Sequence, residues 1–445
     1  MPKDALVRTL ARAFLAGDAT VDAIVFRTEH ALGRSWRWLT PLARRYVATM
    51  GGATPPRHRE VVRFLIRDKG FRIARRKHVD ALAIEQWLIE SEPMRLARSW
   101  ALPIISTVGD LAPWLQVEPA DLDWFADLKA LAYKTGRERL WHYHYRVLAK
   151  NGGSIRLIEA PKTRLKELQR CILFEILDKI PPHPAVHGFV KGRSIRTFIQ
   201  PHVGREVVLR MDLRNFFPGI SGVRIQALFR TTGYPESVAD LLGGICSNAV
   251  PRSVWRQISG DIGSAELTEI QARYARPHLP QGAPTSPALA NMCAYRLDCR
   301  LAGLAKSAGA IYTRYADDLA FSGGEQFARR VERFSIQAAA IAIEEGFSVH
   351  HRKTRIMRQG VRQHLAGLVA NQRPNIIRAD FDRLKAMLTN CIRLGPETQN
   401  REDHPDFRSH LEGRIAFVEM INPEKAKRLR KMFERIQWNL RMMNP

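Results

Sequence analysis

Two adjacent aspartates, Asp317 and Asp318, lie between apolar, β-prone segments in the run IYTRYADDLAFSG. The pattern predicts a strand, a tight turn and a second strand, with both carboxylates at the turn. Two such carboxylates repel each other, and their burial costs desolvation free energy. A divalent cation removes both penalties, and carboxylate oxygens suit Mg²⁺ or Mn²⁺. The commoner alternative for a bare Asp-Asp pair is a solvated turn.

A third carboxylate, Asp212, ends the short hydrophobic strand predicted at residues 205–213. Three acids at two strand ends could hold two metal ions about 3.5–4 Å apart. One ion would lower the pKa of an attacking 3′-hydroxyl, and the other would hold a triphosphate and stabilise the leaving pyrophosphate. On residue type alone, a local cap at Asp212 remains the alternative.

The loop LPQGAPTSP, residues 279–287, opens a predicted helix and is rich in Pro, Gly and hydroxyl groups. The first turn of a helix presents free amide donors, and Gly282 would let the backbone approach a nucleotide closely. Gln281 could hydrogen-bond a template base or the sugar of an incoming nucleotide. A compatible interpretation is a helix entry with Ser286 as N-cap and Pro287 at the first helical position.

Basic residues cluster at a predicted β-hairpin and the helix that follows it. They are Arg156, Lys162, Arg164 and Lys166. Such groups suit the β- and γ-phosphates of a nucleotide, although a solvated face is the commoner reason for a basic cluster. Lys353, in the run HHRKTRI, could donate a proton to leaving pyrophosphate; an isolated lysine is more often a surface charge.

The charge of the chain indicates a polyanionic partner. The 445 residues include 70 Lys and Arg against 44 Asp and Glu, a formal net charge of +26 that is dispersed along the sequence. This favours a folded nucleic-acid-binding surface, because phosphate neutralisation with counterion release drives such binding. No apolar run of about 18 residues or signal peptide supports a membrane association. Five cysteines without a CxxC pair predict a reduced, cytoplasmic protein without structural zinc.

Periodicity divides the chain into a helical first part, a mixed core and a helical end. Strands alternate with helices from about residue 140 to 375, which predicts an α/β or α+β core, and Asn371–Pro374 is the predicted hinge to the final helices. Residues 63–78 are predicted as a basic helix with an apolar stripe, suited to RNA or DNA or simply to solvent. The predicted helices cover residues 6–15, 21–32, 59–76, 81–90, 162–180, 378–394, 407–421 and 423–443, and the predicted hairpin residues 141–162.

Seven blocks in this order resemble the reverse transcriptases. They are SIRLIEAPK (154–162), HGFVKGRS (187–194), MDLRNFF (211–217), LPQGAPTSP (279–287), YADDLAFSG (315–323), GFSVHHRKT (346–354) and RQHLAGLVAN (362–371). An ordered set of this kind is far more specific than a single motif. The combination of QGxxxSP with YADD resembles the bacterial retron-type branch of the family.

The resemblance implies a right-hand polymerase fold of the α+β class. It places fingers and palm at residues 105–375, a helical thumb at 376–445, and an α-helical N-terminal extension at 1–104.

The resemblance also implies roles for individual residues. Asp212, Asp317 and Asp318 would bind two Mg²⁺ or Mn²⁺ ions, and Lys353 would assist pyrophosphate departure. Phe217 falls where an aromatic ring excludes a ribose 2′-hydroxyl, and the segment Leu365–Leu368 where a primer grip is expected. The triphosphate and nucleotide pocket would be lined by Arg156, Lys162, Gln281 and Gly282.

Two departures from the retron pattern concern RNA recognition. The expected NAxxH element is FIQPH here, which keeps only His202, and the expected Val-Thr-Gly is Leu365-Ala366-Gly367. The leading hypothesis is an RNA-directed DNA polymerase that adds dNTPs to a 3′-hydroxyl on a dedicated non-coding RNA, in a retron or anti-phage system. An effector protein or a second copy of the chain would be a possible partner.

Three alternatives remain at this point. One is a defence-associated reverse transcriptase with protein-primed or untemplated DNA synthesis. The second, from another class, is a catalytically idle nucleic-acid-binding scaffold, although all three acids and Gln281 are present. The third is a metal-dependent nuclease, a function that would not explain the loop LPQGAPTSP at residues 279–287.

Overall fold

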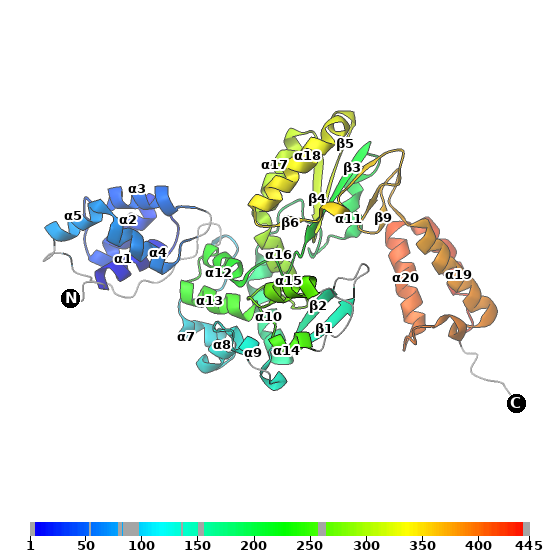
Figure 1. Cartoon of the computed structure of the whole chain (residues 1–445), viewed down its shortest axis with the longest axis horizontal. Helices are drawn as coiled ribbons and strands as arrows, with labels where there is room; N and C mark the ends of the chain where they lie inside the picture. Colours follow the sequence, from blue (N-terminus) through cyan, green and yellow to red (C-terminus); the bar gives the residue numbers. More distant parts are fainter. Residues whose placement is uncertain are drawn as a thin grey trace. The chain divides into compact units, whose positions relative to one another are not determined.

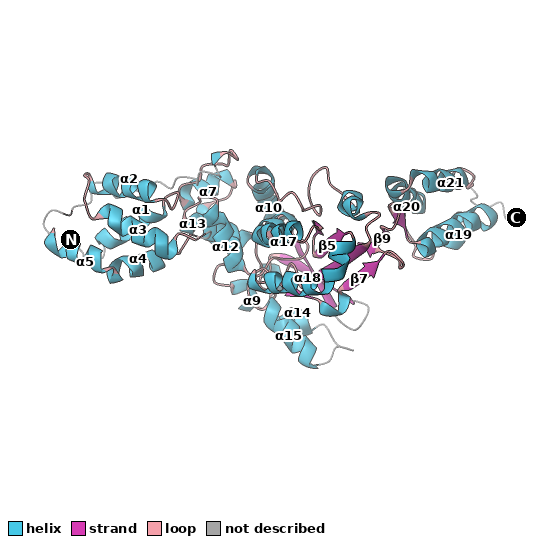
Figure 2. Cartoon of the chain, turned by 90° about the horizontal axis from the view of Figure 1, so that it is seen from above, coloured by secondary structure: helices cyan, strands magenta, loops and turns pink. Residues whose placement is uncertain are grey.

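The computed structural model describes residues 5–52, 55–78, 82, 98–134, 137–149, 155–256 and 264–438. The chain forms two compact units, whose elements are labelled in Figure 1 and coloured by type in Figure 2. The first unit comprises Met1–Pro181 and Asn215–Cys293, and the second Pro182–Arg214 and Ala294–Pro445. The first is mainly helical with one hairpin, whereas the second contains a five-stranded sheet, which is consistent with the predicted α+β class.

The first unit begins with helices around a core of their own, including the fully buried Leu10, Phe14 and Leu42. The predicted helix at 59–76 is wrong, because two helices meet at Asp68. The Asp68 carboxylate accepts a hydrogen bond from the Phe71 amide and starts a new helix there. The predicted helix at 81–90 lies outside the described residues. The helices are α1 (Ala5–Leu15), α2 (Val21–Leu32), α3 (Leu39–Met50), α4 (His58–Arg67) and α5 (Lys69–Lys77).

The rest of the first unit surrounds a β-hairpin. Strands β1 (Tyr143–Ala149) and β2 (Ile155–Pro161) pair antiparallel as predicted, with the connecting turn outside the described residues. Trp141, Leu157 and Val250 belong to the apolar cluster beside it. The helices are α7 (Val108–Trp114), α8 (Pro119–Ala126), α9 (Leu131–Lys134), α10 (Thr163–Glu175), α12 (Gly222–Thr231), α13 (Glu236–Ile245), α14 (Arg252–Arg256), α15 (Ser264–Tyr274) and α16 (Ser286–Cys293).

The second unit is built on an antiparallel sheet with the order β4-β5-β3-β6, in which β7 also pairs with β3. Helices α17 (Tyr295–Ser307) and α18 (Glu325–Glu344) pack against it (Figure 1). Strand β3 reads VVLRMDLR, and six of its eight residues are buried, while the charged Arg210, Asp212 and Arg214 alternate along one face. The strands are β3 (Val207–Arg214), β4 (Ile311–Tyr315), β5 (Asp318–Gly323), β6 (Ser348–Val349) and β7 (Arg355–Arg358).

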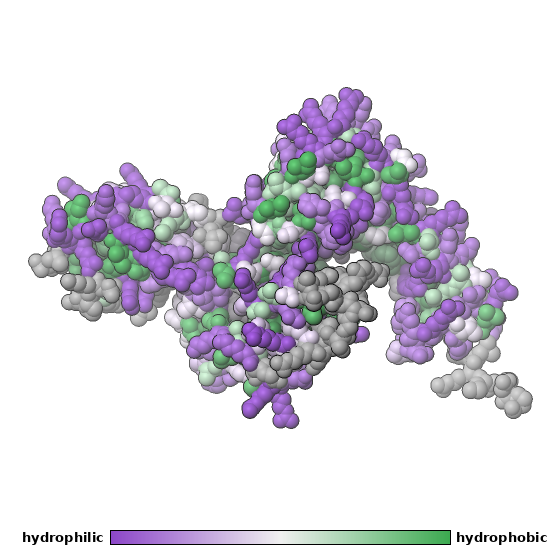
Figure 3. Space-filling model, in the orientation of Figure 1, coloured by the Kyte–Doolittle hydropathy of each residue, from purple (hydrophilic) through white to green (hydrophobic). Residues whose placement is uncertain are grey.

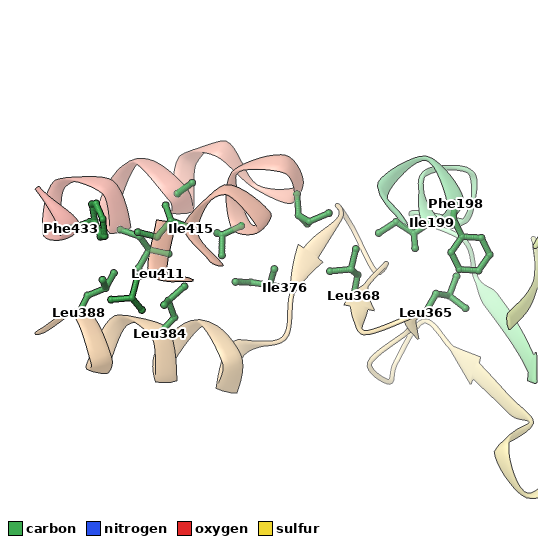
Figure 4. Close-up of a cluster of buried hydrophobic side chains, with 14 of the residues drawn as sticks. Phe198, Ile199, Leu365, Leu368, Ile376, Leu384, Leu388, Leu411, Ile415 and Phe433 are labelled. Atoms are coloured by element: carbon green, nitrogen blue, oxygen red, sulfur yellow. The ribbon is translucent and has the colours of Figure 1, made fainter. Parts of the chain in front are cut away.

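One apolar cluster joins the sheet to the C-terminal helices (Figure 4). Leu365 and Leu368 flank a two-residue turn whose central residues, Ala366 and Gly367, both have positive φ. The side chains of Leu365 and Leu368 pack with the short helix α11 (Ile195–Ile199) on one side. On the other side they pack with Ile376, toward the C-terminal helices. The remaining elements are β8 (His364–Leu365), β9 (Leu368–Val369), β10 (Asn375–Ile376), α19 (Arg378–Leu394), α20 (Phe407–Ile421) and α21 (Pro423–Phe433).

The C-terminal helices confirm two of three predicted ranges. Helices α19 and α20 have the predicted bounds, whereas α21 ends at Phe433, and residues 439–443 of the predicted range lie outside the described residues. In the part of the chain that the structure describes, none of the helices is long and apolar enough to cross a membrane.

Candidate active site

The three predicted carboxylates meet through the pairing of β3 with β5. Asp212 lies directly opposite Asp318 in the antiparallel register, and the Leu213 amide donates to the Asp317 carbonyl at 2.9 Å. Asp212 was predicted to end its strand, but β3 continues to Arg214 because β6 pairs with its last two residues. The sheet therefore brings together acids that are about a hundred residues apart in sequence.

The Tyr-Ala-Asp-Asp turn is held in an uncommon backbone conformation. Ala316 has φ of 54°, in the left-handed region that costs a non-glycine residue free energy. A Cβ added at Gly188 would lie 2.5 Å from the Ala316 amide nitrogen, so only glycine fits beside the turn. Arg314 donates to the Ala316 carbonyl at 3.0 Å, and its fully buried guanidinium pairs with Asp298 at 2.7 Å. This support was not predicted, although the arginine inside the mainly apolar strand IYTRY is a signal that the sequence contains.

Two cationic side chains face the paired carboxylates. Arg210 reaches one oxygen of Asp318 with its Nε at 2.8 Å and its second terminal nitrogen at 2.7 Å. Lys353 lies with its Nζ 3.2 and 3.3 Å from the two oxygens of Asp212. Lys353 was predicted from the sequence, but Arg210 was not, although it lies two residues before Asp212 and so on the same face of the strand.

The third acid is Asp317, and its pKa is raised by its surroundings. Burial, followed by the nearby charges of Asp318 and Asp212, raises the pKa of Asp317 to about 6, against a smaller opposing effect of Lys353. Burial also raises the pKa of Asp318, while Arg210 opposes the rise. The site therefore holds more negative charge than its own cations neutralise at Asp317.

The residue types fit a divalent cation better than their present arrangement does. Carboxylate oxygens are the ligands that Mg²⁺ and Mn²⁺ prefer, and the raised pKa of Asp317 indicates charge that a cation would compensate. Among the described residues, however, no three His, Cys, Asp or Glu side chains are grouped so as to hold a metal ion. Arg210 and Lys353 already engage two of the three carboxylates, so binding a metal ion would require them to release or share those oxygens.

The loop of residues 279–287, here called the PQG loop, packs directly on the β1–β2 hairpin in the first unit. The Glu159 amide of β2 donates to the Gln281 carbonyl at 2.9 Å. Gly282 has φ of 137°, and a Cβ there would lie 2.7 Å from the Glu159 carbonyl oxygen. Glycine at 282 is thus required by the close approach to β2. The N-cap prediction for Ser286 is wrong: Ser286 is the first residue of α16, and its hydroxyl donates to the Pro280 carbonyl at 2.6 Å.

A buried polar network that the sequence did not reveal holds this loop. Glu159 is fully buried, and its two oxygens face the Asn248 amide at 2.7 Å and the His278 Nε2 at 3.0 Å. Burial opposes a charge on His278, but Glu159 raises the pKa of the imidazole overall. A glutamate within the alternating pattern of a strand was the available signal, because its position faces the core.

The other predicted substrate-binding residues also lie in the first unit. Arg156 is exposed on β2, and Phe217 is half-buried in the turn after Asn215, edge-on to Phe216 at 5.6 Å between ring centroids. Lys162 precedes α10, and its ammonium donates to the Glu138 carbonyl at 2.9 Å. The structure thus brings Asp212, Asp317, Asp318 and Lys353 together in the second unit, and places Arg156, Lys162, Phe217, Gln281 and Gly282 in the first.

His202 of the altered retron element has an interior role. It is fully buried, with Nδ1 2.7 Å from the Ser322 hydroxyl and Nε2 2.7 Å from the Thr313 hydroxyl. Burial lowers the pKa of this imidazole to about 3, so it is neutral at physiological pH. His202 therefore bonds to two buried hydroxyl groups inside the second unit.

Comparison with known proteins decides the family. The model of the family described as reverse transcriptase (RNA-dependent DNA polymerase) matches residues 148–378. The retron Mx65 reverse transcriptase of Myxococcus xanthus is 40% identical over 342 residues, which cover 75% of this chain and 73% of the relative. The chain belongs to the retron-type reverse transcriptases.

Two further relatives of this reverse transcriptase have the same description. The retron Mx162 enzyme of Myxococcus xanthus is 34% identical over 345 residues, covering 74% of this chain and 67% of the relative. The retron Ec86 enzyme of Escherichia coli is 28% identical over 335 residues, covering 75% and 90%. This reverse transcriptase is an RNA-directed DNA polymerase, and the family implies palm, fingers and thumb.

Proposed function

We propose that Asp212, Asp317 and Asp318 bind the two divalent cations of a nucleotidyl transfer to a 3′-hydroxyl, with Mg²⁺ as the physiological ion. The observation that carries this proposal is the register of β3 against β5, which sets Asp212 opposite Asp318 with Asp317 in the adjoining turn. When bound, the ions would supply the positive charge that activates the 3′-hydroxyl and stabilises leaving pyrophosphate.

The chain's own residues would bind and orient the substrates. Arg156 and Lys162 are proposed to meet the triphosphate of the dNTP, and Lys353 to give a proton to the leaving pyrophosphate. Gln281 would contact the nucleotide from a loop fixed by Glu159 and by the close approach at Gly282. Phe217 would exclude a ribose 2′-hydroxyl, because a rigid ring leaves no room for the extra oxygen.

We further propose that the template is a dedicated non-coding RNA and that the product is DNA, in a retron or anti-phage setting. The names of the relatives support the retron setting. A cytoplasmic location is proposed because all five cysteines are free. The domain boundaries at residues 104 and 375 remain predictions.

Primer extension tests the proposed site. On an RNA template with a labelled DNA primer, dNTPs and Mg²⁺, the double variant Asp317→Ala with Asp318→Ala is expected to lose at least about a thousandfold in rate. The reason is that metal-held charge contributes several kcal/mol to such a transition state. The matched control is Asp121→Ala with Asp123→Ala, an exposed acidic pair on α8 with the same change in charge.

Equal incorporation by wild type and the Asp317–Asp318 variant would reject the site. Sequencing of the products addresses the alternative: a DNA sequence unrelated to any supplied RNA would favour untemplated synthesis over templated copying.

A further inference from the structure

The N-terminal helices carry a second basic surface, outside the polymerase motifs. Residues 57–78 contain nine Lys or Arg residues against two acids, Glu60 and Asp68. Figure 3 shows mainly hydrophilic residues on the visible face of these helices, with small apolar patches between them. Charge of this density on folded helices requires an explanation beyond solubility.

Both acids of this stretch are already engaged. Glu60 accepts a hydrogen bond from the Arg57 amide at 2.7 Å and so caps α4. Asp68 caps α5 and pairs with Arg45 at 2.7 and 2.8 Å. They therefore leave the outward-facing arginines uncompensated. In the described part of the chain, no ion pair forms at Arg59, Arg63, Arg67, Lys69, Arg72, Arg76 or Lys77.

Helix geometry arranges these cations in stripes. On α4 the inner face is taken by Val61 and Leu65, while Arg59, Arg63 and Arg67 are exposed at intervals of four residues. These three span about 12 Å along one side of the helix. On α5, Phe71 and Ala74 are buried, and the exposed cations are Lys69, Arg72, Arg76 and Lys77.

A surface hollow lies beside Arg63 and Arg67 of α4. It has a volume of about 440 Å³ and is lined by Met50, Glu60, Arg63, Phe64, Arg67 and Asp68. Arg63 and Arg67 thus border one concave site, where planar guanidinium groups can bind a phosphate with two hydrogen bonds each.

We propose that the surface of α4 and α5 binds the phosphate backbone of a double-helical segment of RNA. This rests on the proposed function, which supplies a folded RNA as partner. Rigid helices with spaced arginines suit a regular duplex backbone, which proteins recognise by shape and phosphate contacts. Single-stranded RNA is a poorer fit because its binding uses exposed aromatic platforms. Within residues 58–77 no aromatic side chain is exposed; Phe64 is half-buried and Phe71 is buried.

The test measures binding by the full chain. The triple variant Arg63→Gln, Arg67→Gln and Arg72→Gln is compared with wild type on an RNA hairpin, a single strand of the same length, a DNA hairpin and anionic lipid vesicles. The matched control is Arg329→Gln, Arg330→Gln and Arg333→Gln, three exposed arginines of α18. Thermal melting by circular dichroism checks that both triples remain folded.

We expect the α4–α5 triple to bind the RNA hairpin at least about tenfold more weakly than wild type at 0.15 M salt. Its slope of log affinity against log salt should be shallower by about three, because each lost phosphate contact removes nearly one released counterion. The α18 triple should behave like wild type, and the single strand should be affected less than the hairpin.

Three results would overturn the proposal. The first is unchanged affinity of the α4–α5 triple variant for the RNA hairpin. The second is an equal loss of affinity in both triple variants. The third is a loss of affinity for the vesicles or for the DNA hairpin alone. The proposed polymerase function is tested separately, by measuring dNTP incorporation by the wild-type protein on a short primer–template.

Discussion

Arg210 and Lys353 each set a positive charge against one carboxylate of the β3–β5 pair, whereas no described residue forms an ion pair with Asp317. Burial and the nearby charges of Asp318 and Asp212 raise the pKa of Asp317 to about 6, and Lys353 opposes this rise only in part. A buried carboxylate that lacks compensation reduces the stability of the folded state, and such destabilised groups are typical of functional sites.

Asp317→Asn is therefore expected to stabilise the protein while abolishing activity. A rise in pKa from 3.8 to about 6 corresponds to at most about 3 kcal/mol. Because the folded-state pKa is raised, the wild-type protein loses stability as pH rises from about 4 to 6. The difference in free energy of unfolding between Asp317→Asn and the wild-type protein should thus be greatest above pH 6 and vanish below about pH 4. Denaturant unfolding at several pH values measures it.

Magnesium provides the control for this expectation. Added Mg²⁺ should raise the unfolding midpoint of the wild-type protein at pH 7.5 more than that of Asp317→Asn, because a bound cation compensates the same charge. An unstabilised variant, or equal stabilisation of both proteins by Mg²⁺, would contradict the electrostatic account.

At the scale of elements, single buried side chains hold the functional loops against their supporting strands. Glu159 of β2 holds the PQG loop against the β-hairpin of the first unit, and its carboxylate forms hydrogen bonds with His278 and Asn248. In the second unit, Arg314 of β4 joins the Ala316 carbonyl in the turn to Asp298 of α17. Both arrangements use a buried charge whose removal leaves its partner without compensation.

Arg314→Met is expected to destabilise the second unit by about 3–5 kcal/mol, because Asp298 would remain buried without its partner. Adding Asp298→Leu should restore much of this stability, since an apolar pair can replace a buried ion pair. Activity should remain low in the double variant, because the Ala316 carbonyl still lacks its donor. Urea unfolding and primer extension together separate the two effects. Recovery of full activity along with stability would show that Arg314 supports folding alone.

At the scale of the whole molecule, two compact units share the polymerase motifs between them, and both are interrupted in sequence. The chain crosses between the units three times: after Pro181, after Arg214 at the end of β3, and after Cys293 at the end of α16. The cluster of Leu365, Leu368 and Ile376 ties the C-terminal helices to the sheet of the second unit (Figure 4). A net charge of +26 acts over all of these parts.

The charge predicts strong salt dependence of substrate binding. The affinity of the full chain for an RNA–DNA primer–template should fall about a hundredfold or more between 0.05 and 0.2 M salt, as expected for four or more phosphate contacts. Fluorescence anisotropy with a labelled primer measures this, and a neutral osmolyte at matched concentration is the control. A change below about threefold would mean that the excess positive charge is not used in binding.

The sequence by itself determined the family, the enzyme class and the type of most elements. Seven ordered blocks carry that information, because reaction chemistry requires particular side chains at particular places in the chain. The periodic patterns of 378–394 and 407–421 predicted α19 and α20 to the residue, since helix spacing is a local property. Where a cap competed with periodicity, as at Asp68, the local pattern misled and predicted one helix in place of two.

Only the tertiary structure decided which groups neutralise one another. Arg210 with Asp318, Arg314 with Asp298 and Glu159 with His278 are separated by 16 to 119 residues in the chain. Such pairs arise from sheet register and helix packing, which no local pattern specifies. For the same reason the requirement for glycine at 282, set by a β2 carbonyl, was visible only in the folded chain.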